Sequence, residues 1–125
     1  MELRATAKFV RWLTTHDDLE AVRLVRVLRR LLQDLPSQPT EPSPLVAPIV
    51  QASHGYNLWR IKHHHIPGHA MRLIVWFPED NPEFAYIVFA GNKHPNHDVW
   101  YDRAVREAEH EVDTIRRKQQ SKGAP

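Results

Sequence analysis

A cluster of prolines divides the chain into two parts with different apolar patterns. Five of the ten prolines fall within residues 36–48, PSQPTEPSPLVAP. Proline lacks the backbone N–H that helix interiors and central strands require, so this stretch is predicted to be an extended connector. The 35 residues before it are too few to hold a hydrophobic core alone. We therefore expect the connector to lie inside one domain.

The segment before the connector is predicted to be mainly helical. Residues 2–10 are predicted to form a short strand, and residues 19–35 an amphipathic helix that Pro36 ends. Apolar residues recur there every three or four positions, at Leu19, Val22, Val25, Leu28, Leu31, Leu32 and Leu35. Two pairs offer capping chemistry at the start of this helix, Thr15 with Asp18 or Asp17 with Glu20.

The segment after the connector has the composition of strands. Three stretches rich in aromatic and β-branched residues alternate with turn compositions, at 56–65, 71–77 and 84–91. Short turns between them predict an antiparallel meander. Apolar residues at helical spacing then predict a closing helix over about 98–118, which Asn96 or Asp98 can cap.

These elements predict an α+β fold. We expect an antiparallel sheet of three to four strands, an N-terminal helix layer and a C-terminal helix, all in a single domain of residues 1–118 with a flexible tail over 119–125. The helices are expected to cover one face of the sheet and to leave the other partly free for function.

Composition excludes several classes of protein. The chain of 125 residues has no cysteine, which excludes a disulfide scaffold, a cysteine zinc site and a cysteine nucleophile. No run of about 18 apolar residues exists, and the start lacks the apolar region of a signal peptide, so we expect a cytoplasmic protein without a membrane span. The net charge of +2 does not by itself indicate a nucleic-acid binder.

Basic side chains recur on the predicted sheet. Strand alternation places Arg60, Lys62 and His64 on one face, opposite to Trp59 and Ile61. The next strand carries Arg72, and Lys93 follows the last strand and leads to Trp100 and Tyr101. Such cations can hold a phosphodiester and stabilise charge that develops on it. Polar residues are also ordinary on a solvated sheet face, and Tyr101 lies on an apolar stripe, so structural roles stay open.

Nine histidines are the unusual part of the composition. HHHIPGH at 63–69 places four of them in one turn, and His94 and His97 follow the last strand. Adjacent strand histidines point to opposite faces, and no carboxylate has the spacing of a zincin helix, so no metal site is predicted. We favour a role for one or two of these histidines as proton carriers or as hydrogen-bond donors to a phosphate group, with His94 as one candidate.

The order of elements and two stretches resemble the RelE/ParE superfamily, the toxins of type II toxin–antitoxin modules. LWRIK at 58–62 followed by MRLIVWF at 71–77 resembles that family's basic pair and following arginine. The stretch YIVFAGNKHPNHDVWYDRAVREAE at 86–109 resembles the final strand and closing helix of a RelE/HigB-like subgroup. The resemblance implies an endoribonuclease that needs no metal or other cofactor. Such toxins enter the ribosomal A site and cut mRNA by attack of a ribose 2′-OH on the adjacent phosphate.

The resemblance also implies roles for individual residues. Arg60 and Lys62 take the basic strand positions, and Lys62 would bind phosphate or assist proton transfer from the 2′-OH. Arg72 would stabilise the charge on the scissile phosphate, and Lys93 matches a basic residue at the strand exit. Tyr101 would act as general acid/base or stack on a base. Further candidate RNA contacts are His64, His94, Trp100, Arg26 and Arg30.

The resemblance implies partners and leaves alternatives. The partners would be a cognate antitoxin, mRNA and the ribosome. The arginines around Arg26 and Arg30 form either a solvated helix face or a contact for RNA or an acidic antitoxin segment. The superfamily also contains ParE-type members that inhibit DNA gyrase without nuclease activity, and an inactive interaction module would share the fold.

Overall fold

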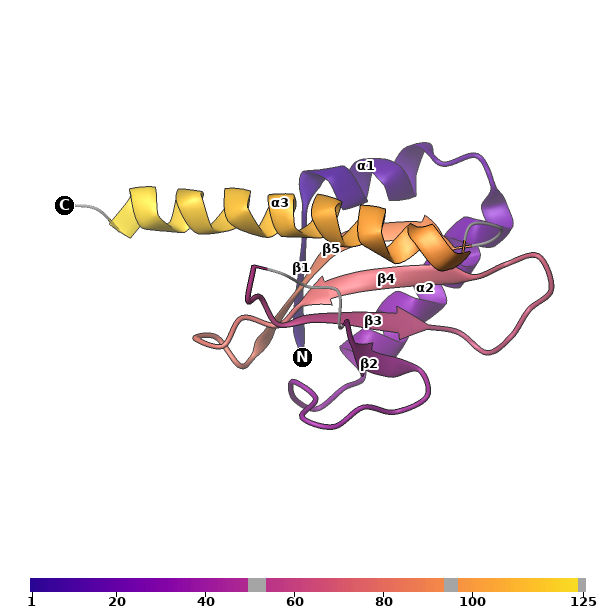
Figure 1. Cartoon of the computed structure of the whole chain (residues 1–125), viewed down its shortest axis with the longest axis horizontal. Helices are drawn as coiled ribbons and strands as arrows, with labels where there is room; N and C mark the ends of the chain where they lie inside the picture. The colour runs from indigo at the N-terminus through magenta and orange to yellow at the C-terminus, as the bar shows by residue number, and fades with distance from the viewer. Residues whose placement is uncertain (50–53, 94–96, 124–125) are drawn as a thin grey trace.

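Five strands and three helices make up the part of the chain that the computed structural model describes, residues 1–49, 54–93 and 97–123. Figure 1 shows their arrangement. In chain order they are β1 (Glu2–Ala5), α1 (Ala7–Thr15), α2 (Leu19–Gln33), β2 (Val46–Pro48), β3 (Leu58–Lys62), β4 (Met71–Trp76), β5 (Phe84–Asn92) and α3 (His97–Gly123).

The strands form one mixed sheet in the order β1-β5-β4-β3-β2. The meander of β3, β4 and β5 is antiparallel, as predicted. The prediction of a purely antiparallel sheet of three to four strands is wrong, because β1 pairs in parallel with β5 and β2 adds an antiparallel edge. The prolines of the connector permit this edge, since Pro48 needs no hydrogen-bond donor on the open side of β2.

Capping side chains determine where the first two helices begin. The predicted strand at 2–10 ends at Ala5, because the Thr6 side chain caps α1 by accepting a hydrogen bond from the Phe9 N–H at 3.1 Å. For α2, the predicted caps Thr15 and Asp17 are both wrong, because Asp18 is the residue that caps the helix. Its carboxylate accepts from the N–H groups of Glu20 and Ala21 at 3.1 and 3.2 Å. The helix then ends at Gln33, close to the predicted end.

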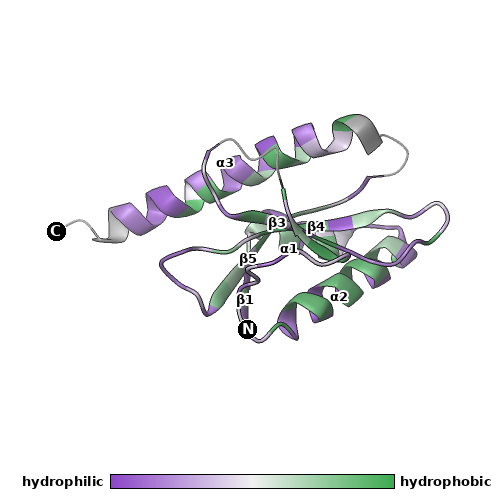
Figure 2. Cartoon of the chain, turned by 60° about the horizontal axis from the view of Figure 1, so that its bottom comes forward, coloured by the Kyte–Doolittle hydropathy of each residue, from purple (hydrophilic) through white to green (hydrophobic). Residues whose placement is uncertain are grey.

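Helices pack on both faces of the sheet, which corrects the prediction that one face is left partly free. Figure 2 shows the sheet between α2 on one side and α3 on the other. One core cluster joins Leu28 of α2 and Phe9 of α1 to the strand face that carries Trp59 and Ile61. A second cluster joins α3 to the opposite face.

The closing helix is longer than predicted. α3 continues to Gly123 rather than ending near 118, because no proline or glycine interrupts residues 119–122. Its C-terminal end projects beyond the sheet in Figure 1. Among the helices described, none is both long and apolar enough to span a membrane.

Candidate functional site

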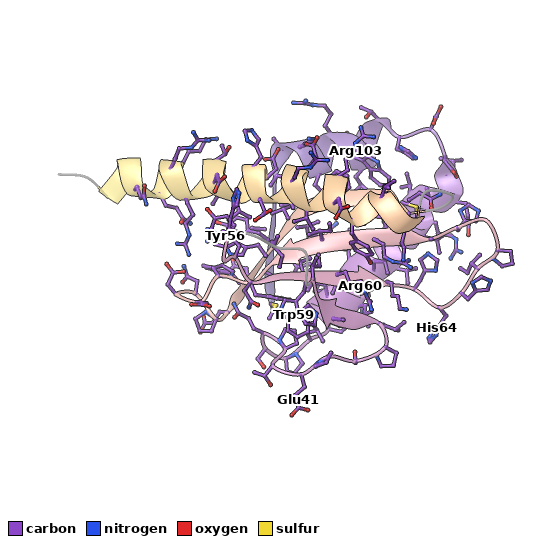
Figure 3. All side chains as sticks on the ribbon, viewed as in Figure 1. Glu41, Tyr56, Trp59, Arg60, His64 and Arg103 are labelled. Carbon is purple, nitrogen blue, oxygen red and sulfur yellow. The ribbon has the colours of Figure 1, made fainter. Side chains whose placement is uncertain are left out.

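Three basic residues meet on the sheet face that α3 covers. We call Arg60, Lys62 and Arg72 the basic cluster. Lys62 of β3 pairs directly with Arg72 of β4, and Arg60 lies one pleat away on the same face as Lys62. Leu58, two residues before Arg60, packs against α3. Because side chains alternate along a strand, Arg60 and Lys62 lie on the same face of β3 as Leu58. Alternation therefore predicted this face correctly, and Figure 3 labels Arg60 on β3.

The basic cluster has no counter-charge in the residues described. The ion pairs found in residues 1–49, 54–93 and 97–123 involve other side chains. Burial, followed by the like charges of Arg60 and Arg72, holds the pKa of Lys62 below its usual range. The site thus concentrates positive charge that no carboxylate of the described ranges pairs with.

Hydrogen-bond donors of the basic cluster are also left open. Arg72 Nη1 donates to the Met71 carbonyl at 2.9 Å. In contrast, Arg60 Nη1 and Arg72 Nε are buried and lack a hydrogen-bond partner among the described residues. Buried donors normally have partners, so these two mark a place where an acceptor from outside can bind.

The first turns of α3 bring aromatic side chains to the same end of the sheet. Lys93 Nζ lies 5.1 Å from the centre of the Tyr101 ring, a cation–π distance. Trp100 packs edge-to-face against Tyr101, with ring centres 5.0 Å apart, and against Phe89 at 5.9 Å. The residues predicted at 93, 100 and 101 are therefore neighbours of one another.

Gly91 makes room for this aromatic group. It pairs with Arg72 across β4 and β5. A Cβ atom at this position would lie 3.1 Å from both Phe89 Cε1 and Trp100 Cζ2. Glycine inside a strand often marks such a close approach. This signal was present in the sequence, but nothing there identified Trp100 as the neighbour.

The histidine-rich turn lies beside the basic cluster. Residues 63–70 connect β3 to β4 and enclose a pocket of about 260 Å³. His64 lines it with Lys62 and Arg72, and Figure 3 labels His64 on this loop. His63 braces the turn. Its Nδ1 lies 2.6 Å from the His64 carbonyl, and its Nε2 accepts from the Met71 N–H at 3.1 Å.

Two predicted contacts are not brought to this site, and one is not described. Arg26 and Arg30 are exposed on α2, which packs against the other face of the sheet. They border a separate depression with Arg29. His94 lies outside the described residues, as does the proposed cap Asn96. The helical period predicts that these arginines share one face of a helix. It does not predict which face of the sheet that helix covers.

A polar cluster that the sequence did not reveal lies on the middle of α3. Glu109, which is 2% exposed, accepts a hydrogen bond from the His54 N–H at 2.6 Å. The His54 ring lies 3.4 Å from Asp113, which also accepts from the Tyr56 hydroxyl. This hydrogen bond and burial raise the pKa of Tyr56. Glu109 and Asp113 are four residues apart on a helix, which puts them on one side. The cluster fastens the segment before β3 to α3.

Neither metal ligands nor similarity to known proteins identifies a further function for the described residues. In the described ranges, no three histidine, aspartate or glutamate side chains are grouped to hold a metal ion. Comparisons with protein-family models, with curated proteins and with solved structures found no match to this chain. The chemistry of the basic cluster and its aromatic neighbours is therefore what bears on function.

Proposed function

We propose that this chain is the toxin of a type II toxin–antitoxin module, a cytoplasmic endoribonuclease that cuts mRNA on the ribosome without a metal. The observation that carries the proposal is the basic cluster: three cations on one sheet face, with no carboxylate partner in the described residues. Cations held in advance at a partly buried site stabilise the negative charge that develops on a phosphate during cleavage.

Each cation has a role in the proposed reaction. The ribose 2′-oxygen attacks the adjacent phosphorus while the bond from phosphorus to the 5′-oxygen breaks. Arg60 donates to the phosphate oxygens through Nη1, which has no acceptor among the described residues, and Arg72 donates through the outer end of its guanidinium. Lys62 assists removal of the 2′-OH proton, because its lowered pKa brings its neutral form closer to working pH. The products are a 2′,3′-cyclic phosphate and a 5′-hydroxyl.

Tyr101 supplies the proton that the leaving 5′-oxygen takes. The position of Lys93 over its ring supports this role, because it places the tyrosine beside a cation that can attract the phosphate. Trp100 lies against the same ring and offers a surface on which an RNA base can stack.

The proposed partners follow from the same reasoning. The antitoxin would neutralise the toxin, and the exposed arginines Arg26 and Arg29 of α2 offer an acidic segment a positive surface on the helix side of the molecule.

Induced expression in bacterial cells tests this proposal. The intact chain is expected to arrest growth and to leave cut messages, whereas Arg72→Ala is expected to relieve the arrest. Arg103→Ala is the matched control, because Arg103 is an exposed arginine on α3. Arrest with intact messages and inhibited DNA supercoiling would instead support a gyrase inhibitor. A folded protein that never arrests growth would support an interaction module.

A further inference from the structure

The pocket inside the β3–β4 loop is lined by several residues to which no role is assigned above. We call it the loop pocket. Its volume is about 260 Å³. No carboxylate of the described chain contributes to its wall. Two cations and four imidazoles line it, from Lys62, His63, His64, His65, His69 and Arg72. A concave site with this lining attracts anions.

Two nitrogen atoms in the wall of the loop pocket are left without partners in the described part of the chain. His69 Nδ1 and Arg72 Nε are buried and have no hydrogen-bond partner among the residues described. Both residues line the pocket. A neutral small molecule would satisfy the hydrogen bonds but not the charge, whereas an oxyanion satisfies both.

His63 has a different function from the other three histidines. Its Nε2 accepts from the Met71 N–H, so that nitrogen carries no proton, and Nδ1–H donates to the His64 carbonyl. The neutral ring therefore braces the loop. His64 and His65 are exposed and His69 is half-buried, so these three imidazoles can hydrogen-bond to an anion that enters the pocket.

The charged groups around the loop pocket do not cancel its positive charge. From the strands come Lys62 and Arg72, and Lys93 follows β5, where its N–H bonds the Ala70 carbonyl at 2.9 Å. An acid of α2, Glu20, interacts electrostatically with His69. Glu20 is already held by Arg23 through two hydrogen bonds of 3.0 and 2.6 Å.

We propose that the loop pocket binds a phosphate group. Within the proposed function, on which this assignment to RNA rests, the ligand is the phosphate that neighbours the scissile one. Lys62 and Arg72 belong to both sites, so two successive phosphates of one strand would be held on either side of them.

Calorimetric titration of the purified full chain with sulfate tests the proposal. Sulfate is the probe because its charge does not change between pH 6 and pH 8, unlike that of inorganic phosphate. We expect saturable binding at pH 6 by the wild-type chain, and a loss of about tenfold when one donor is removed, the size of one charge-assisted hydrogen bond. His69→Asn and His64→Asn are each expected to weaken binding at pH 6. His110→Asn, a change on the exposed side of α3, is the control.

The outcomes separate this proposal from the ribonuclease. Absence of saturable sulfate binding at pH 6, or equal affinity of the folded wild-type and His69→Asn chains for sulfate, would overturn the loop pocket even if the protein cuts mRNA. Sulfate binding that His69→Asn weakens, in a protein that leaves mRNA intact, would support the pocket as an anion site and remove its assignment to RNA. Circular dichroism of each variant establishes that it is folded.

Discussion

Lys62 on β3 and Arg72 on β4 are direct cross-strand partners, so two positive side chains leave the sheet side by side on the face that α3 covers. Like charges placed opposite each other destabilise a pair of strands. Ile74, two residues along β4 from Arg72, is fully buried against apolar neighbours. The sheet therefore changes from a hydrophobic core to an uncompensated positive site within one pleat.

Replacing Lys62 by methionine is expected to raise the free energy of unfolding at pH 7. The side chain loses a charge that burial and two neighbouring arginines disfavour, and keeps most of its apolar length. Urea denaturation measures the effect, with Lys118→Met on the exposed part of α3 as the control. A lower denaturation midpoint for the folded Lys62→Met chain than for the wild type would contradict the electrostatic account of this site.

The stability gained by Lys62→Met is expected to depend on pH. Because the folded-state pKa of Lys62 lies below its unfolded value, the unfolded chain binds this proton more tightly. The destabilisation is complete below the folded pKa and disappears as the pH rises toward the unfolded value of about 10.4. Midpoints measured from pH 7 to pH 10 should therefore converge for the two chains. A difference that stays constant would assign the effect to packing instead.

Tyr101→Phe is expected to lower the cleavage rate by about 10²–10⁴-fold, the usual contribution of general acid–base catalysis. The ring stays in place against Trp100 and beneath Lys93, so the fold should be unchanged. Tyr86→Phe removes a comparable hydroxyl from a partner of Arg4, away from the proposed chemistry, and serves as control. Full cleavage by Tyr101→Phe would leave the tyrosine with a packing or stacking role only.

Gly91→Val is expected to destabilise the protein by about 1–3 kcal/mol, the usual penalty for overpacking. The new side chain would begin 3.1 Å from atoms of Phe89 and Trp100. Adding Trp100→Ala should recover part of the loss, and a double-mutant cycle measures the coupling. If the two changes are simply additive, Trp100 does not set the need for glycine at this position.

Asp18→Ala is expected to destabilise the protein by about 0.5–2 kcal/mol, because two N–H groups of the first turn of α2 lose their acceptor. Asp17→Ala, which changes the adjacent exposed carboxylate, should stay within about 0.5 kcal/mol of the wild type. Thermal or urea unfolding distinguishes the two. An equal loss in both variants would indicate a general effect of charge rather than a cap.

The sequence predicts those elements whose pattern is local. Apolar period and turn composition place α2 and the meander of β3 to β5 within a few residues of their observed ends. The parallel pairing of β1 with β5 joins Glu2 to Phe84, and no local pattern specifies a contact over that separation. The helix α1 was missed because AKFV fits a strand equally well, and only the cap at Thr6 decides between them.

The candidate site was likewise predictable only where it depends on a local pattern. Alternation on one strand correctly placed Arg60 and Lys62 together, because the period of a strand fixes its faces. The register that sets Lys62 against Arg72, and Arg72 against Gly91, depends on pairing between strands. Arg26 and Arg30 were joined to the site only by charge, and they lie on the helix that covers the other face.

Cleavage of a ribosome-bound message by the purified protein is the most direct test of the central claim. Attack by the 2′-oxygen leaves a 5′-hydroxyl on the downstream fragment, which a polynucleotide kinase labels without prior phosphatase treatment. We expect labelled fragments with the wild-type chain and a reduction of about 10²-fold or more with Arg72→Ala, the scale seen when a group that stabilises transition-state charge is removed. An intact message, or equal cleavage by the folded Arg72→Ala chain, would contradict the assignment of this sheet face to phosphodiester chemistry.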